Sequence, residues 1–325
     1  MALLAGIDEA GYGPHLGPLV VAVAAMEFDT DAAPDPDLWP ALETHVAPRP
    51  AAGETRVVVC DSKVAHGRTD GPALLERAVL GFLAAAGVRP RTLAALLRAV
   101  DAAEDGRAPP PPWHRPEALV LPAMATAESV DEASRQLEEG LAATGGRAAV
   151  LSVRVARADR FNRLVGEGAR NKASALFGLA AELIGEMRRR QGNGPAHLTM
   201  DRHGGRRYYG RLLAGAFPMA DVRVEAEAAE ESRYVLSGPG PGAGPMHITI
   251  RERCEAWSLA TALASMAAKY IRELHMLQLN AWFGERVPGL RRTAGYGRDA
   301  WRFLSEVAAA REAVGVPEST MLRCR

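Results

Sequence analysis

The sequence has few of the features that mark a secreted, membrane-embedded or zinc-stabilised protein. Cysteine occurs only at Cys60, Cys254 and Cys324, and no two of these have metal-ligand spacing. An odd number of distant cysteines argues against a disulfide framework and indicates a reducing compartment. The apolar run from Leu19 to Met26 is too short to span a bilayer, and the first residues lack the basic start of a signal peptide. We therefore expect a cytoplasmic protein without membrane association.

An excess of charge of one sign is also missing, because 39 basic residues balance 39 acidic ones. With 48% hydrophobic residues, the chain resembles an ordinary globular protein, and its composition does not by itself indicate a nucleic-acid binder. A neutral total still permits a local basic groove. Lysine is nearly absent, with 36 arginines beside Lys63, Lys172 and Lys269. A GC-rich genome is one explanation, and a need for the ammonium group at these three positions is another.

Predicted strands alternate with predicted helices along the 325 residues. Hydrophobic patterns predict strands at 3–7, 19–26, 56–59, 148–155 and 196–200, and further strands within 221–253. They predict helices at 72–87, 128–143, 171–190, 208–216, 256–282 and 299–313. Such alternation indicates an α/β fold around a central sheet.

Adjacent acids stand where the first strand meets a glycine-rich turn, at Asp8 and Glu9. Side chains alternate across a strand, so the two would point to opposite faces unless the strand ends there. A hard divalent cation would offset their repulsion. Without such a cation, the pair is simply a solvated start of the turn.

Two further acids have similar positions. Asp201 ends the predicted strand at 196–200, and ligand sites in open α/β sheets favour such carboxyl ends. The residues after it, 202–207, form a basic, glycine-containing loop suited to phosphates, or else an ordinary surface loop. Glu255 directly precedes the predicted helix 256–282, where it would bind metal or only cap the helix.

Four segments, in order, closely resemble ribonuclease HII. They are Gly-Ile-Asp-Glu-Ala-Gly-Tyr-Gly-Pro at 6–14 with Leu-Gly-Pro-Leu-Val at 16–20, Asp-Ser-Lys at 61–63, Ala-Ser-Met-Ala-Ala-Lys-Tyr-Ile-Arg-Glu at 264–273, and Ala-Gly-Tyr-Gly at 294–297. The resemblance implies a single ribonuclease H-like domain over 1–325, with a central mixed sheet flanked by helices and with insertions at about 29–54, 88–145 and 215–250.

The resemblance also implies a metal-dependent endonuclease that cuts the RNA strand of RNA–DNA hybrids. Asp8, Glu9 and Asp201 match three of the family's four metal-binding carboxylates, and counting fourteen residues back from Lys269 places Glu255 at the fourth. Two Mg²⁺ or Mn²⁺ ions would activate a water and stabilise the leaving 3′-oxygen. The implied substrate-binding residues are Gly11, Tyr12, Gly13, Lys63, Asn171 and Tyr296. Lys269 is expected to have a structural or an outer-groove role. The expected partner is nucleic acid, with no obligate protein partner.

The sequence departs from the family at two of these positions. Glu255 stands where the family has Asp, and Tyr12 stands where it has a basic residue between two glycines. Two alternatives therefore stay open: a nuclease of the same superfold with another target, and a non-catalytic nucleic-acid-binding descendant. The sequence determines neither the exact substrate, the preferred metal and the oligomeric state, nor the role of residues 88–145.

Overall fold

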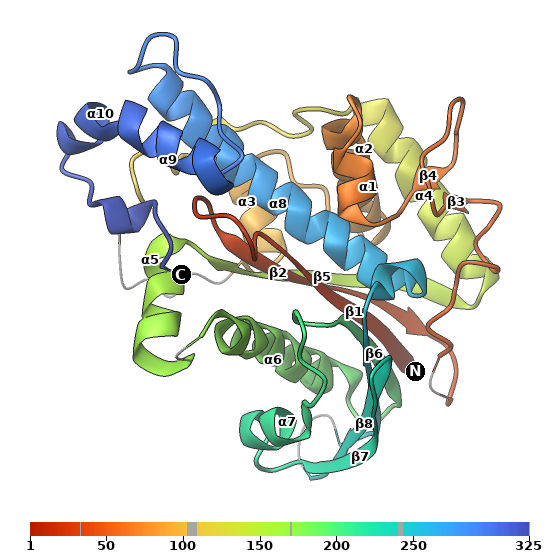
Figure 1. The fold of residues 1–325 in the computed structure, drawn as a ribbon. Helices are drawn as coiled ribbons and strands as arrows, with labels where there is room; N and C mark the ends of the chain where they lie inside the picture. Colours follow the sequence, from red (N-terminus) through yellow and green to blue (C-terminus); the bar gives the residue numbers. More distant parts are fainter. Residues whose placement is uncertain (33, 103–108, 170, 240–242, 325) are drawn as a thin grey trace.

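The computed structural model of the chain describes residues 1–32, 34–102, 109–169, 171–239 and 243–324. A seven-stranded mixed sheet forms its centre, in the order β5-β2-β1-β6-β9-β8-β7 (Figure 1). Its strands are β1 (Ala2–Ala10), β2 (Leu19–Phe28), β5 (Gly146–Ala156), β6 (Ala196–Asp201), β7 (Asp221–Glu227), β8 (Glu231–Ser237) and β9 (Met246–Arg251). A separate two-stranded parallel sheet pairs β3 (Val46–Ala47) with β4 (Val57–Val58).

The helices are mostly amphipathic and lie on both faces of the central sheet. They are α1 (Ser62–His66), α2 (Gly71–Ala85), α3 (Leu93–Ala99), α4 (Ala127–Ala143), α5 (Ala158–Arg163), α6 (Lys172–Gln191), α7 (Gly210–Ala216), α8 (Leu259–Gly284), α9 (Gly297–Glu306) and α10 (Ala308–Glu312). Short helical turns occur at η1 (Pro116–Ala118), η2 (Leu164–Ala169), η3 (Cys254–Ala256) and η4 (Glu318–Thr320).

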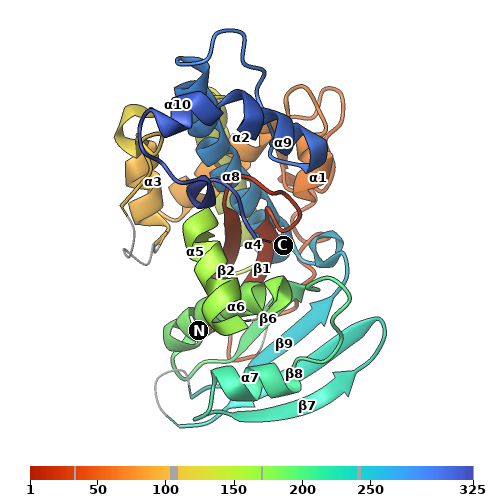
Figure 2. The same ribbon diagram turned by 60° about the vertical axis from the view of Figure 1, so that its left-hand side comes forward.

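The position of β1 in the sheet explains its continuous burial. It pairs antiparallel with β2 on one side and parallel with β6 on the other, and β6 in turn is parallel to β9. Leu4 of β1 belongs to a core shared with α2, α4 and α8, whereas Leu3 and Ile7 belong to a core shared with α6. Figures 1 and 2 show α8 and α6 on opposite faces of these strands. Burial on both faces explains why the sequence at the start of β1 is almost continuously apolar.

These features confirm the predicted fold class, an α/β fold with a central mixed sheet flanked by helices. Several predicted boundaries were wrong. The strand expected at 3–7 continues to Ala10, because its pairing with β2 extends through Asp8 and Glu9, so the two acids lie within β1 and not at a break after it. The helix expected from 256 begins at Leu259, because Arg253 is left-handed (φ 55°), η3 follows it, and the Ser258 side chain caps α8 at Thr261 N. The last predicted helix is divided into α9 and α10 at Val307.

Among the helices of the described residues, none is long and apolar enough to cross a membrane.

Candidate active site

Three neighbouring strands bring the predicted acids to one edge of the sheet. β1 carries Asp8 and Glu9, and β6 ends at Asp201. The parallel register pairs Ile7 with Met200. Asp8 and Asp201 are the next residues on these two adjacent strands, so they lie side by side in the sheet. Beyond β6, β9 ends at Arg251 and leads within four residues to Glu255 in η3. Parallel strands thus place four carboxylates at their common carboxyl edge.

Close packing of α8 against β1 builds the next layer of the site. A Cβ at Gly6 would lie 2.1 Å from the Thr261 backbone nitrogen, so only glycine admits the first turn of α8 at this point. One turn further along α8, Ser265 hydrogen-bonds the Asp8 side chain and donates to Ser62 Oγ at 3.0 Å. The glycine two residues before Asp8 therefore determines how closely α8 and α1 approach the acid.

Asp201 also has a structural role. Its Oδ1 accepts a hydrogen bond from Cys254 N at 3.1 Å. This contact ties the end of β6 to η3, the turn that carries Glu255. The same carboxylate therefore contributes charge to the cluster and positions the fourth acid.

Burial and electrostatic repulsion shift the pKa values of the two acids of β1, Asp8 and Glu9, most strongly. Burial raises the pKa of Asp8 well above its ordinary value, and the charges of Glu9 and Asp201 raise it further. Burial and the charge of Asp201 raise the pKa of Glu9 to about 7, although Lys63 and a hydrogen bond from Asp8 act in the opposite direction. Groups whose charged forms oppose one another in this way are candidates for a functional site.

Burial and the neighbouring charges also shift the pKa values of Asp201, Glu255 and Lys63. Burial raises the pKa of Asp201, and burial together with the charges of Asp201 and Asp61 raises that of Glu255. At Lys63 burial lowers the pKa, but Asp61, Asp8, Glu255 and Asp201 outweigh it, so that the pKa is raised. The ammonium group of Lys63 therefore faces the acids and partly balances their charge.

The donor set suits a hard cation, although its side chains do not yet enclose one. Throughout the described parts of the chain, no three His, Cys, Asp or Glu side chains are grouped closely enough to hold a metal ion as they stand. The chemistry nevertheless fits: the donors are carboxylate oxygens, which Mg²⁺ and Mn²⁺ prefer. In addition, Glu9 Oε2 is buried without a hydrogen-bond partner. Such an atom is costly to bury unless another group satisfies it.

The loop after β1, the glycine loop, has a backbone conformation that requires glycine at position 11. Gly11 has φ +90°, and a Cβ there would lie 2.4 Å from the Pro18 carbonyl oxygen and 2.9 Å from Arg272 Nε. Arg272 is fully buried and donates to the carbonyl oxygens of Leu16 and Ala294 at 3.2 and 2.9 Å. This arginine therefore supports the loop from below and joins it to the turn before α9.

Tyr296 lies beside this loop, as a substrate-contacting tyrosine would have to. Its ring is 3.8 Å from the position of a Cβ at Gly13, and it is 48% exposed. Tyr12, by contrast, is half-buried and packs against the core beneath α6. Of the predicted residues at this loop, Gly13 and Tyr296 are thus exposed, whereas Gly11 is buried and Tyr12 mainly fills space.

Two other predicted roles have visible structural explanations. Asn171 caps α6 by accepting a hydrogen bond from Ser174 N at 2.9 Å, so capping is its observed contact. Lys269 pairs with Glu273 at 2.8 Å along α8, in keeping with the structural role expected of it.

Sequence reasoning missed three residues around the site: Ser265, Asp61 and Arg272. Ser265 and Arg272 lie within the helix segment 264–273, and Asp61 lies within the segment 61–63, so the motifs contained them. Nothing in the one-dimensional pattern showed that Ser265 reaches Asp8 or that Arg272 reaches the glycine loop.

No protein-family model matches the sequence. No curated protein matches it either.

Several solved structures are similar to the chain. A chain of the PCNA:RNase HII complex from Archaeoglobus fulgidus is 16% identical, with 99% of this chain and 94% of that chain covered and a TM-score of 0.43. Ribonuclease H2 from Pyrococcus horikoshii is 14% identical over 98% and 92% of the two chains, with a TM-score of 0.41. Bst-RNase HIII in complex with Mn²⁺ is 15% identical over 99% and 66%, with a TM-score of 0.40. At these identities and scores, neither activity nor site residues carry over to this chain. These three structures are of ribonucleases H or of a complex that contains one.

Proposed function

We propose that the chain is a metal-dependent endonuclease that hydrolyses the RNA strand of RNA–DNA hybrids. The observation that carries the proposal is the cluster of Asp8, Glu9, Asp201 and Glu255 at the common end of three strands, with every pKa raised. Buried like charges of this kind destabilise a protein unless a cation or a substrate uses them.

These four carboxylates would hold the metal. When bound, two Mg²⁺ or Mn²⁺ ions would supply the charge that activates a water and stabilises the leaving 3′-oxygen. Because the acids do not enclose an ion as they stand, we expect small side-chain rotations on binding, with the unpartnered Glu9 Oε2 gaining a partner. Lys63, which already faces the acids, would attract and orient the scissile phosphate.

The glycine loop would distinguish RNA from DNA. Gly13 is exposed and leaves its backbone uncovered beside Tyr296, which allows a close approach to a ribose, while the buried Gly11 shapes the turn before it. The 2′-hydroxyl of that ribose is the group that separates RNA from DNA. Arg272, buried beneath Gly11, would supply positive potential at this point of the loop. The phosphate-suited loop at 202–207 follows Asp201 directly and would contact the strand on the other side.

A second candidate is a nuclease of the same superfold with a different target. It is favoured by Tyr12, which packs against the core and brings no charge to the loop where the resembled family has a basic residue.

A substrate panel tests both proposals. We expect the purified protein with Mg²⁺ or Mn²⁺ to cut an RNA–DNA hybrid and to leave an all-DNA duplex intact. Asp8→Asn and Glu255→Gln should abolish cleavage, while Glu312→Gln is the control, because the Glu312 side chain is 71% exposed and far from the four acids in sequence.

Each outcome separates the alternatives. Cutting of all-DNA or all-RNA substrates in place of the hybrid would select the second candidate. No cutting of any substrate, together with retained hybrid binding and no calorimetric Mn²⁺ binding, would show a non-catalytic descendant and contradict both.

A further inference from the structure

An exposed tryptophan continues the ligand-facing surface beyond Tyr296. Trp301, on the first turns of α9, is 45% exposed, close to the 48% of Tyr296. Its ring is tilted against the His15 ring, with centroids 5.7 Å apart. Single exposed aromatic residues are common on protein surfaces, and what distinguishes Trp301 is its position against His15 of the glycine loop.

The backbone holds the two aromatic residues beside the glycine loop in a fixed order. His15 N and Leu16 N both donate to the Gly295 carbonyl oxygen, at 2.8 and 3.2 Å. Gly13 therefore faces Tyr296, and two residues further along the loop His15 faces Trp301. Moving away from Glu9, a ligand would meet Tyr296 first and Trp301 next.

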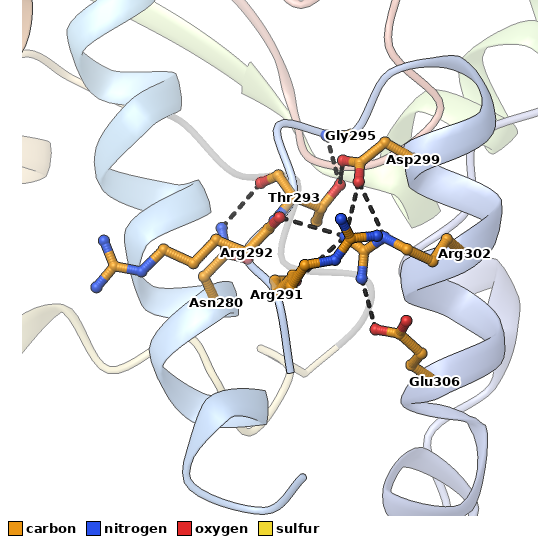
Figure 3. A network of polar contacts seen from close by, with 8 residues as sticks. All are labelled: Asn280, Arg291, Arg292, Thr293, Gly295, Asp299, Arg302 and Glu306. Atoms are coloured by element: carbon orange, nitrogen blue, oxygen red, sulfur yellow. Dashed lines mark hydrogen bonds and ion pairs between the residues drawn. The ribbon is translucent and has the colours of Figure 1, made fainter. Parts of the chain in front are cut away.

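A polar network holds the segment before α9 rigidly (Figure 3). Thr293 Oγ1 donates to Asp299 at 2.6 Å and accepts from Gly295 N at 2.9 Å, while Thr293 N donates to Asn280 Oδ1 at 2.8 Å. The Arg302 guanidinium contacts Asp299 and Glu306 and donates to the carbonyl oxygens of Arg291 and Arg292. Such preorganisation lowers the entropy cost of binding a ligand.

The same network leaves this surface positively charged. Arg302 pairs with both nearby acids, Asp299 and Glu306. Three other arginines, Arg291, Arg292 and Arg298, are exposed, and their guanidinium groups form no ion pair or hydrogen bond with another described residue. Their guanidinium groups are therefore available to an anionic partner.

We propose that Trp301, His15 and Arg298 bind an unpaired stretch of the nucleic-acid strand that leaves the active site. The proposal rests on the nuclease function, because it takes the ligand of the glycine loop to be nucleic acid. Aromatic rings beside uncompensated arginines fit stacked bases and their phosphates, and stacking is tolerant of sequence.

The proposed surface should make the protein prefer hybrids that carry an unpaired extension. A hybrid with a single-stranded extension should bind more tightly than the same hybrid with blunt ends, because only the extension offers an unpaired base to Trp301.

Anisotropy titrations in EDTA test this inference without requiring cleavage. For a labelled hybrid with a single-stranded extension of about six nucleotides, Trp301→Ala should weaken binding about five- to a hundredfold. Binding of the blunt hybrid should change less than about twofold, and Trp301→Tyr should restore the extension effect because it keeps a stacking ring. Arg298→Gln should reduce the salt dependence of binding to the extension by about 0.7 in the logarithmic slope.

Met219→Ala is the matched control. Met219 is 76% exposed and lies between α7 and β7, far from α9 in Figure 1. A thermal melt establishes that each variant is folded, and Trp301→Tyr tests the inference if the alanine variant is not.

The outcomes separate this inference from the proposed function. Equal binding of the extended hybrid by the wild type and by folded Trp301→Ala overturns it, as does an equal loss for the blunt hybrid. A Trp301 effect on binding in EDTA, together with no cleavage of the same hybrid in Mg²⁺ or Mn²⁺, would support the binding surface while contradicting the nuclease. Cleavage in the presence of metal without a Trp301 effect on binding would contradict the surface alone.

Discussion

Neutralising Glu9 should stabilise the metal-free protein while abolishing its response to metal. Glu9→Gln keeps the size of the side chain and removes a charge that burial and Asp201 oppose. Residues shaped for binding often destabilise the unliganded fold, and their replacement then raises stability at the expense of function.

The size and the pH dependence follow from the raised pKa. Between the ordinary value of 4.5 and the folded value of about 7, the folded protein holds a proton on Glu9 that the unfolded chain has lost. Stability is therefore lost as the pH rises through this window, and the whole loss is present at pH 8. At about 1.4 kcal/mol per pH unit, it amounts to about 3 kcal/mol.

Thermal unfolding in EDTA measures this effect. At pH 8, Glu9→Gln should melt about 5 °C above the wild type, and at pH 4.5 the two should nearly coincide. The control is Glu312→Gln, because the Glu312 side chain is 71% exposed and far from the cluster in sequence. With Mn²⁺ the wild type should gain stability and the variant should gain much less. A variant that is neutral or less stable at pH 8 in EDTA would refute the electrostatic reasoning.

Three further changes test other parts of the structure. Gly6→Ala should lower the free energy of unfolding in urea by about 3 kcal/mol or more, since the added Cβ would lie 2.1 Å from the Thr261 backbone. Gly178→Ala, whose Cβ would have nothing within 4 Å, should be neutral or stabilising by about 1 kcal/mol. Equal effects of the two substitutions would contradict the close helix–strand contact. Burial, together with the neighbouring His114, Arg157 and Arg272, lowers the pKa of His275 to about 3, so the stability of the fold should fall as the pH drops from about 6.5 towards 3. In urea titrations His275→Leu should reduce this loss of stability at acid pH, and an unchanged pH dependence would contradict the assignment to His275. Asn171→Ala should cost about 1 kcal/mol through loss of the α6 cap and Asn171→Ser should restore it; weaker hybrid binding by the stable Ser variant would show that Asn171 also contacts substrate.

The central strands were predictable because their signal is local. The apolar runs at 3–7, 19–26 and 196–200 correspond to β1, β2 and β6, and Asp201 ends its strand as predicted. The long helix was recognisable from its period, but its first turn was not, because a left-handed Arg253 and the Ser258 cap together set its start. Predictions of this kind fail where single backbone conformations decide a boundary.

The sequence proposes the members of the candidate site but not the surroundings of their side chains. Glu255 was found by counting within a motif, and the structure places it beside Asp201. That Lys63 faces all four acids, that Ser265 reaches Asp8, and that Arg272 lies under Gly11 are contacts between segments far apart in the chain. They follow from the packing of α8 on β1 and could not be read from local pattern.

End analysis of the cleaved RNA strand tests the central claim most directly. A hybrid carrying a 5′-labelled RNA strand is incubated with the protein and Mn²⁺, and with the folded Asp201→Asn variant as reference. Attack by water with departure of the 3′-oxygen predicts fragments that end in 3′-hydroxyl and 5′-phosphate groups, formed by the wild type and not by Asp201→Asn. Fragments with cyclic 2′,3′-phosphates, or equal cleavage by the two proteins, would contradict a carboxylate-bound metal site at Asp8, Glu9, Asp201 and Glu255.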